Sequence, residues 1–314
     1  MTSFVRHPGG SDAPLTPEEC ETYDRLRRSL PGRETNDAFL DRYYPRPDDL
    51  DYADLPHAFQ QTVHHRGRLV EFLSGPQDLP AGESVPDYWF EAARRGRVGV
   101  TMAAQHLRPV FPLLANAIAE FTTDIRVARF SFSADDPRTR IGLFYLQRSK
   151  KEGRPLALVG FPPNPSPATP PPYWSLVPPQ LREFTATVHD GLVEDHRFDN
   201  GLVAVSALRT CEEYASQTGV FDEVEHITAY DAGFRPVPMD EVARPPAMCV
   251  VAHNGRRVAY MFEITDPRSA AWSFGDDTLL QATKPITELL DDVMATRIRK
   301  SSRLPDADPN PAQD

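Results

Sequence analysis

The sequence predicts an α+β fold, and three observations lead to this prediction. Apolar residues recur at helical spacing through residues 16–122. Residues 126–160 then hold short runs rich in β-branched and aromatic residues, which are typical of strands. Further along, Asn254-Gly255 separates two apolar runs, and this dipeptide is the strongest two-residue signal for a β-hairpin. We therefore expect helices and antiparallel strands in both halves of the chain.

The N-terminal half is expected to be rich in helices after a flexible tail at residues 1–15. Thr16-Pro17-Glu18-Glu19 has the pattern of a capping box with proline at the first helical position. Pro109 and Pro112 fall inside the longest helical pattern, so that helix must start late or kink there. The helices expected in this half are residues 16–31, 39–44, 56–73, 85–95 and 103–122.

A small antiparallel sheet is expected after these helices. Its strands are residues 127–132, 141–147 and 156–160, and a polar loop at residues 149–153 joins the last two. Together the helices and the sheet predict a first domain over residues 16–160.

A proline-dense segment at residues 161–172 marks the clearest boundary in the chain. Proline has a fixed φ and no backbone N–H, so this segment cannot lie inside a helix or a central strand. We interpret it as an extended, solvated linker. The alternative is a docking peptide for an SH3- or WW-like partner.

A second domain is expected over residues 173–300. Pro178-Pro179 suits the first turn of a helix that stops at Gly191, and residues 192–203 read as a polar, acidic loop. The remaining elements are a helix at 211–218, strands at 224–230, 247–252, 257–264 and 270–274, a helix from Pro285, and a disordered tail at 301–314.

The composition indicates which kinds of partner the protein can bind and in which cell compartment it works. The 314 residues carry a formal net charge of -11, which disfavours nucleic-acid binding and suits a basic protein partner. Cys20, Cys211 and Cys249 are few and widely spaced, as in proteins of a reducing cytoplasm. The chain start lacks a signal-peptide pattern, and no apolar run approaches the ~18 residues that span a bilayer. We expect a cytoplasmic protein that does not bind membranes.

Nucleophilic catalysis has only a weak candidate in the sequence. Cys211, His189 and Asp190 could form a nucleophile with its base, but nothing in their spacing fixes such a geometry. We interpret Cys211 as a small core residue. The sequence also lacks Gly-x-Ser-x-Gly and the glycine-rich phosphate loops.

Metal and acid–base sites have equally weak signals. His64-His65 lack the i, i+4 spacing that places two ligands on one helical face, so we expect no metal and no cofactor. Asp135-Asp136 and Asp276-Asp277 could serve a glycosidase only if they converged in space. We interpret them as turn and cap residues. The chain is therefore not expected to be an enzyme.

Residues 173–299 resemble the SUKH superfamily. The resemblance is carried by Tyr173-Trp174, the run Leu181-Arg182-Glu183-Phe184 and the helix end His189-Asp190-Gly191. An apolar stretch at residues 201–205, a hairpin at 249–264, a strand with Trp272 and a closing helix follow in similar order. The superfamily includes bacterial immunity proteins that neutralise polymorphic toxins and fungal regulators of cell-wall synthesis. The resemblance implies a curved antiparallel sheet with packed helices, and binding of protein partners without catalysis.

These observations predict a cytoplasmic, immunity-type protein that binds a toxin domain, which would be basic. The acids that follow the first helix of the second domain lie on one loop and could meet such a partner, although an ordinary solvated loop is the alternative. The expected partner-binding residues are Trp174, Asp190, Glu194, Asp195 and Asp199. Two other functions stay open: a hydrolase with paired acids in a cleft between the halves, and a scaffold that docks through its proline-rich segment.

Overall fold

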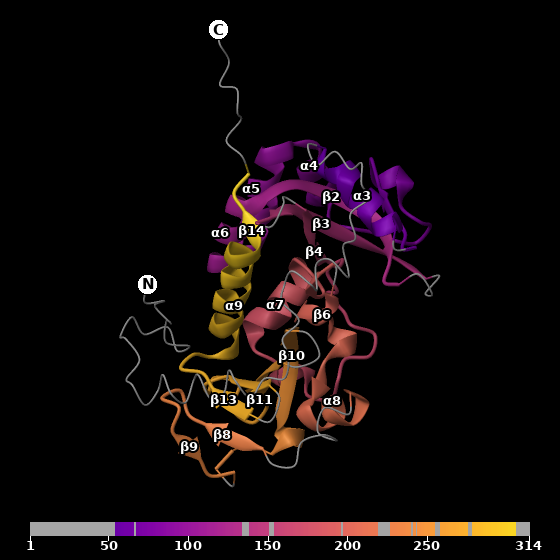
Figure 1. The fold of residues 1–314 in the computed structure, drawn as a ribbon. Helices are drawn as coiled ribbons and strands as arrows, with labels where there is room; N and C mark the ends of the chain where they lie inside the picture. The colour runs from indigo at the N-terminus through magenta and orange to yellow at the C-terminus, as the bar shows by residue number, and fades with distance from the viewer. Residues whose placement is uncertain are drawn as a thin grey trace, which may run out of the picture. The chain divides into compact units, whose positions relative to one another are not determined.

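The computed structural model describes residues 54–305 apart from 66, 134–137, 151–153, 196, 219–226, 240, 243, 255–257 and 276–277. These residues form seven α-helices and 14 strands with mixed pairing, which confirms the α+β class (Figure 1). The expected tail at 1–15, the helices at 16–31 and 39–44, and the two acid pairs Asp135-Asp136 and Asp276-Asp277 lie outside the described residues.

The chain forms two compact units, and each is assembled from separate stretches of sequence. In the described chain, unit 1 contains residues 167–182 and 199–290, and unit 2 contains residues 54–166, 183–198 and 291–305. This division differs from the expected boundary at residues 161–172. Apolar side chains explain the difference, because Phe184 packs edge-on against Phe111 and Val193 joins the core cluster of unit 2.

Unit 2 is built on an antiparallel sheet in the order β1-β2-β3-β4-β5, with β14 paired to β3. The strands are β1 (Val70–Phe72), β2 (Thr122–Ser131), β3 (Thr139–Ser149), β4 (Pro155–Gly160), β5 (Leu192–Glu194) and β14 (Ser302–Arg303). The three strands expected in the N-terminal half thus coincide with β2, β3 and β4. Ser302 and Arg303, which were expected in a disordered tail, instead form β14, and Ser302 Oγ donates to Gln147 Oε1 at 2.7 Å.

The helices of unit 2 pack on this sheet (Figure 1). They are α3 (Leu55–His65), α4 (Asp87–Arg94), α5 (Gly96–Leu107) and α6 (Pro112–Phe121). Phe59 of α3 meets Phe144 of β3 edge-on, with ring centroids 5.7 Å apart, and both side chains are fully buried. Burial of each such ring stabilises the fold by about 1.5–3 kcal/mol.

The break that Pro109 and Pro112 predict is present between α5 and α6. Pro112 is the first residue of α6, and Asp291 from α9 (Ile286–Ser301) covers that helix end. The Asp291 carboxylate accepts the N–H groups of Leu113 and Leu114 at 3.0 and 2.7 Å. An acid from a distant helix thus satisfies amides that have no partner within α6 itself.

The helix expected at residues 56–73 is too long, because α3 ends at His65 and Val70–Phe72 form a strand. Gly67 causes this end, with a φ of 72° in the left-handed region. Its N–H donates to His64 O, and Arg68 N–H donates to Val63 O. These two bonds form a Schellman motif, which stops a helix and turns the chain.

Unit 1 contains the order β6-β10-β11-β12-β13-β8-β9, with β7 paired to β10 and with β13 and β8 parallel. Cys211, Met261, Trp272 and Phe274 are among the residues of its buried core cluster. Its elements are β6 (Arg197–Leu202), β7 (Arg209–Thr210), α8 (Cys211–Thr218), β8 (Thr228–Tyr230), β9 (Pro236–Val237), β10 (Met248–Asn254), β11 (Val258–Glu263), β12 (Trp272–Gly275) and β13 (Thr278–Gln281).

Most elements expected in the C-terminal half are present, and one expectation is wrong. The helix at 211–218, the hairpin strands and the strand with Trp272 coincide with α8, β10, β11 and β12, while α7 (Pro179–Thr187) and α9 begin where their prolines predict. Residues 192–203, however, are not a solvated loop, because they contain β5 and β6. Leu192, Val193 and Leu202 are buried, which draws this stretch into paired strands.

Candidate functional site

The two ends of the segment from Phe161 to Gly191 are hydrogen-bonded to each other within unit 2. Phe161 N–H donates to Gly191 O at 3.2 Å, Asp190 N–H donates to Phe161 O at 3.3 Å, and Asn164 N–H donates to Thr185 O at 2.8 Å. Gly191 has a φ of 99°, which favours glycine at this turn. The ends of the proline-rich stretch are therefore fixed to a folded unit.

The buried ring of His189 contacts both Phe161, at the start of this segment, and the core of unit 2. The ring is fully buried, with Nε2 2.8 Å from Tyr145 Oη and Nδ1 3.3 Å from Phe161 O. Burial lowers the pKa of His189 to about 3, so the ring is neutral near pH 7. Gly160 leaves the space that the ring occupies, since a Cβ there would lie 2.4 Å from ring atoms. His189 therefore serves packing and hydrogen bonding in a dry environment.

Trp174 is half-buried and lies in unit 1 on a short, partly exposed segment, residues 170–176. Trp174–Leu176 form a single 3-10 turn, in which Val177 N–H donates to Trp174 O at 3.2 Å. Leu176 is 47% exposed, whereas Val177 just after it is buried. The Tyr173 hydroxyl is also buried, and this burial, with Cys249 beside it, raises the pKa of Tyr173. Buried side chains next to the turn thus fix an exposed apolar surface.

Asp190 and Glu194 lie in unit 2 and have partners there. Asn164 Nδ2 donates to Asp190 Oδ2 at 3.1 Å. Arg297 of α9 forms an ion pair with Glu194, in which Arg297 Nη2 donates to Glu194 Oε2 at 2.9 Å. Both carboxylates contribute to holding unit 2 together. Asp199 lies in β6, and its side chain is outside the described residues.

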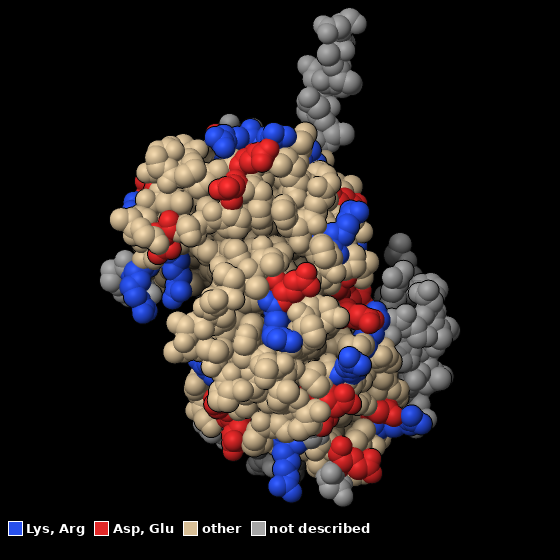
Figure 2. All heavy atoms as spheres, turned by 180° about the vertical axis from the view of Figure 1, so that it is seen from behind, with Lys and Arg blue, Asp and Glu red and all other residues tan. Residues whose placement is uncertain are grey.

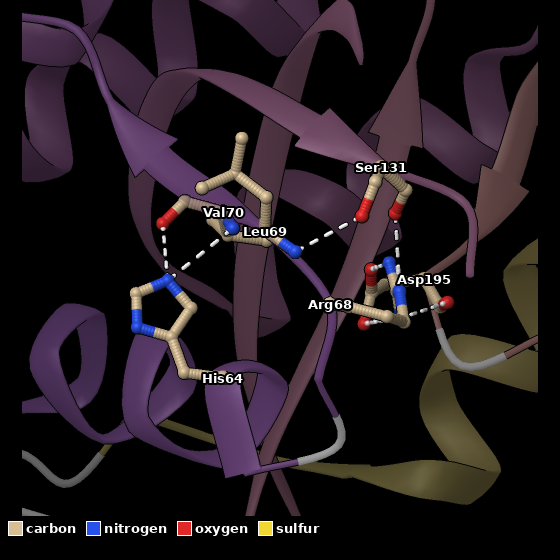
Figure 3. Close-up of polar contacts among 6 residues, drawn as sticks. All are labelled: His64, Arg68, Leu69, Val70, Ser131 and Asp195. Atoms are coloured by element: carbon tan, nitrogen blue, oxygen red, sulfur yellow. Dashed lines mark hydrogen bonds and ion pairs between the residues drawn. The ribbon is translucent and has the colours of Figure 1, made fainter. Parts of the chain in front are cut away.

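Asp195 is the clearest departure from a surface loop, because its side chain is fully buried (Figure 3). Arg68 Nη2 donates to Asp195 Oδ1 at 2.7 Å, and Arg68 Nη1 lies 3.3 Å from Asp195 O. Arg68 Nε donates to Ser131 O at 3.1 Å. Arg68 thus ties the start of β1, the end of β2 and the turn after β5 together, and Asp195 is closed to any partner.

The same region protects the exposed edge of the unit 2 sheet (Figure 3). The edge strand β1 presents the backbone of Val70. His64 Nε2 lies 2.9 Å from Val70 O and 3.4 Å from Val70 N, and Gln60 Nε2 donates to Val70 O at 3.1 Å. Side chains from α3 therefore cover the backbone groups that could pair with another strand. His64 serves this structural role.

Three of the five expected partner-binding residues, Asp190, Glu194 and Asp195, therefore do not form one acidic surface within unit 2. Asp190, Glu194 and Asp195 belong to unit 2 and turn to three different partners, while Trp174 belongs to unit 1. Sequence reasoning missed Arg68, which is 127 positions from Asp195. No local pattern could have signalled that pairing.

Nucleophilic and metal chemistry have little support among the described residues. Cys211 and Cys249 are buried free thiols, and burial raises their pKa values to about 11 and about 12. Both thiols are therefore protonated near pH 7, and Cys211 is a core residue as expected. In the part of the chain that the structure describes, no three His, Cys, Asp or Glu side chains are grouped closely enough to hold a metal ion.

Comparison of the chain with protein-family models, with curated proteins and with solved structures gave no match. Within the described residues, every helix is too short or too polar to cross a membrane.

Proposed function

We propose that this chain is a non-catalytic, immunity-type protein that binds a toxin domain through residues 170–176. The observation that carries this proposal is the turn of unit 1 where the half-buried Trp174 and the exposed Leu176 lie next to buried neighbours. The resemblance of residues 173–299 to SUKH immunity proteins gives the class of partner.

The 170–176 segment has the properties of a protein-binding surface. Pro170 and Pro172 are exposed, and their fixed φ lowers the entropy that binding would otherwise remove. Tryptophan is among the residues that most often dominate binding energy at interfaces. The exposed Leu176 adds apolar area directly beside it.

Charge favours a basic partner for unit 1. Residues 167–182 and 199–290 contain fourteen Asp and Glu against eight Lys and Arg. Figure 2 shows charged side chains of both signs scattered among broad uncharged areas on one face of the molecule. A partner would therefore be steered by the overall acidic charge and held by apolar contact.

The test is protection from toxins encoded by genes next to the gene for this chain. Each toxin domain is co-expressed with the wild-type chain or with Trp174→Ala/Leu176→Asp, and growth is measured. We expect the wild type to restore growth with one toxin and the double variant to fail. Leu304→Asp changes an exposed leucine in unit 2 and serves as the matched control, which should protect fully.

Binding is then measured by calorimetry with an inactivated form of the same toxin domain. The double variant should bind at least about 30-fold more weakly, as expected for loss of an interface hot spot of about 2 kcal/mol. Equal protection and equal affinity for the double variant and the wild type would exclude the 170–176 segment as the binding surface.

A further inference from the structure

Unit 2 contains a hollow of about 560 Å³ that the proposed toxin-binding surface does not involve. It lies where α3 begins, α4 ends and α5 begins, beside the first half of β2 and the end of β3. We call it the arginine hollow, and its wall consists of Asp54, Leu55, Pro56, Ala93, Arg94, Gly96, Thr123, Asp124, Arg126 and Arg148.

The wall of the arginine hollow has more positive than negative groups, although the whole chain has a net charge of -11. Three arginines face two aspartates there. Arg126 is fixed in place, since its Nη2 pairs with Asp124 Oδ2 at 2.7 Å and its Nη1 donates to Ala93 O at 3.0 Å. A local excess of guanidinium groups on an acidic protein favours an anionic ligand.

Arg94 lines the hollow and has N–H groups that are not used in hydrogen bonds within the described residues. Its Nε donates to Phe90 O at 3.1 Å, while its two terminal nitrogens have no partner among the described residues. The side chain is exposed at the end of α4. Two parallel N–H donors on a guanidinium match the oxygens of a phosphate or carboxylate group.

The amino end of α5 adds backbone donors to the same hollow. Gly96 is the first residue of this 12-residue helix, and no side chain caps the helix end. A Cβ built on Gly96 would meet no atom within 4 Å, so open space lies beside its backbone. The first N–H groups of a helix have no partner within the helix and attract anions.

We propose that the arginine hollow binds a small phosphate monoester, with Arg94 and the amino end of α5 holding the phosphate group. Donors that approach from several directions suit a dianion with three terminal oxygens. The hollow is larger than phosphate alone requires and lies in the size range of small-molecule sites. The Asp54 carboxylate at the wall can accept hydrogen bonds from hydroxyl groups of the rest of the ligand.

The test is calorimetric titration of the full chain with glycerol 3-phosphate, and with glycerol at the same ionic strength. We expect glycerol 3-phosphate to bind and glycerol to give no signal. Arg94→Gln should weaken binding about tenfold or more, as expected for loss of a charge-assisted hydrogen bond.

Arg95→Gln is the matched control, because Arg95 follows Arg94 in sequence, pairs with Glu91 and does not line the hollow. This variant should bind like the wild type. Absence of binding by the wild type would overturn the proposal. Equal binding by the wild type and Arg94→Gln would show adventitious anion binding only and would also overturn it.

Discussion

The Arg68–Asp195 pair of unit 2 and the 170–176 segment of unit 1 use their side chains in opposite ways. Asp195 is a charged residue that is fully buried, and its carboxylate is bound by an arginine from a distant part of the chain. Leu176 is an apolar residue that is 47% exposed on a turn held by buried neighbours. Residue type alone therefore does not indicate which of these side chains are exposed at the surface.

The largest change in the free energy of unfolding is expected when the buried Arg68–Asp195 ion pair is broken. Asp195→Ala should lower the free energy of unfolding by about 3–5 kcal/mol, because it leaves the Arg68 guanidinium buried without its counter-ion. Urea unfolding measures this change. Glu71→Gln is the control, since Glu71 pairs with Arg129 at the exposed surface and its loss should cost about 1 kcal/mol or less. Similar values for both variants would contradict the assigned role of Asp195.

The free energy of unfolding is expected to depend on pH because of His189. The unfolded residue binds a proton near pH 6.5, whereas in the folded state its pKa is about 3. Between these values the unfolded state binds more protons, so stability falls as the pH falls from about 6.5 toward 3. The contribution of one such group approaches about 1.4 kcal/mol per pH unit.

Urea unfolding between pH 7 and pH 4.5 tests this expectation with His189→Gln. The variant should be less stable at pH 7, and its free energy of unfolding should depend less steeply on pH than that of the wild type. Equal slopes for both proteins would show that His189 is protonated in the folded state.

A smaller effect is expected from Glu194, whose pair with Arg297 is partly exposed. Glu194→Gln should lower the free energy of unfolding by about 1 kcal/mol or less, because water screens the pair. The loss should shrink further in high salt. If Glu194→Gln lowered the free energy of unfolding as much as Asp195→Ala does, the partial exposure of Glu194 would not explain a difference between the two acids.

The smallest effect on stability is expected from the exposed turn. Leu176→Asp should change the free energy of unfolding by about 0.5 kcal/mol or less, because the side chain makes its contacts at the surface. Thermal unfolding measures the change. A shift of several degrees in the midpoint would indicate that Leu176 supports the fold of unit 1.

Local signals predicted much of the fold. Pro112, Pro179 and Pro285 placed the starts of three helices, and alternating apolar residues placed the strands around Tyr145 and Tyr260. Gly67 also carried a local signal, a helix stop, but the apolar spacing of Val70 concealed it. These features depend on neighbours within a few residues, which is why sequence patterns capture them.

The candidate sites depend on contacts that no local pattern contains. Asp195 meets Arg68 from 127 positions away, and Asp291 caps a helix that begins 179 positions before it. The arginine hollow is assembled from five elements, so nothing in the sequence near any one of its arginines indicates the site. Trp174 was expected at a binding surface, and that role stays a prediction.

The most direct test of the central claim compares Trp174→Ala with Glu194→Gln in binding to the toxin domain that the wild type neutralises. Both residues were expected at the partner surface, yet Trp174 lies on the partly exposed 170–176 segment, while Glu194 pairs with Arg297. Calorimetry should give at least about 30-fold weaker binding for Trp174→Ala and wild-type affinity for Glu194→Gln. Loss of affinity in Glu194→Gln together with full affinity in Trp174→Ala would contradict the account.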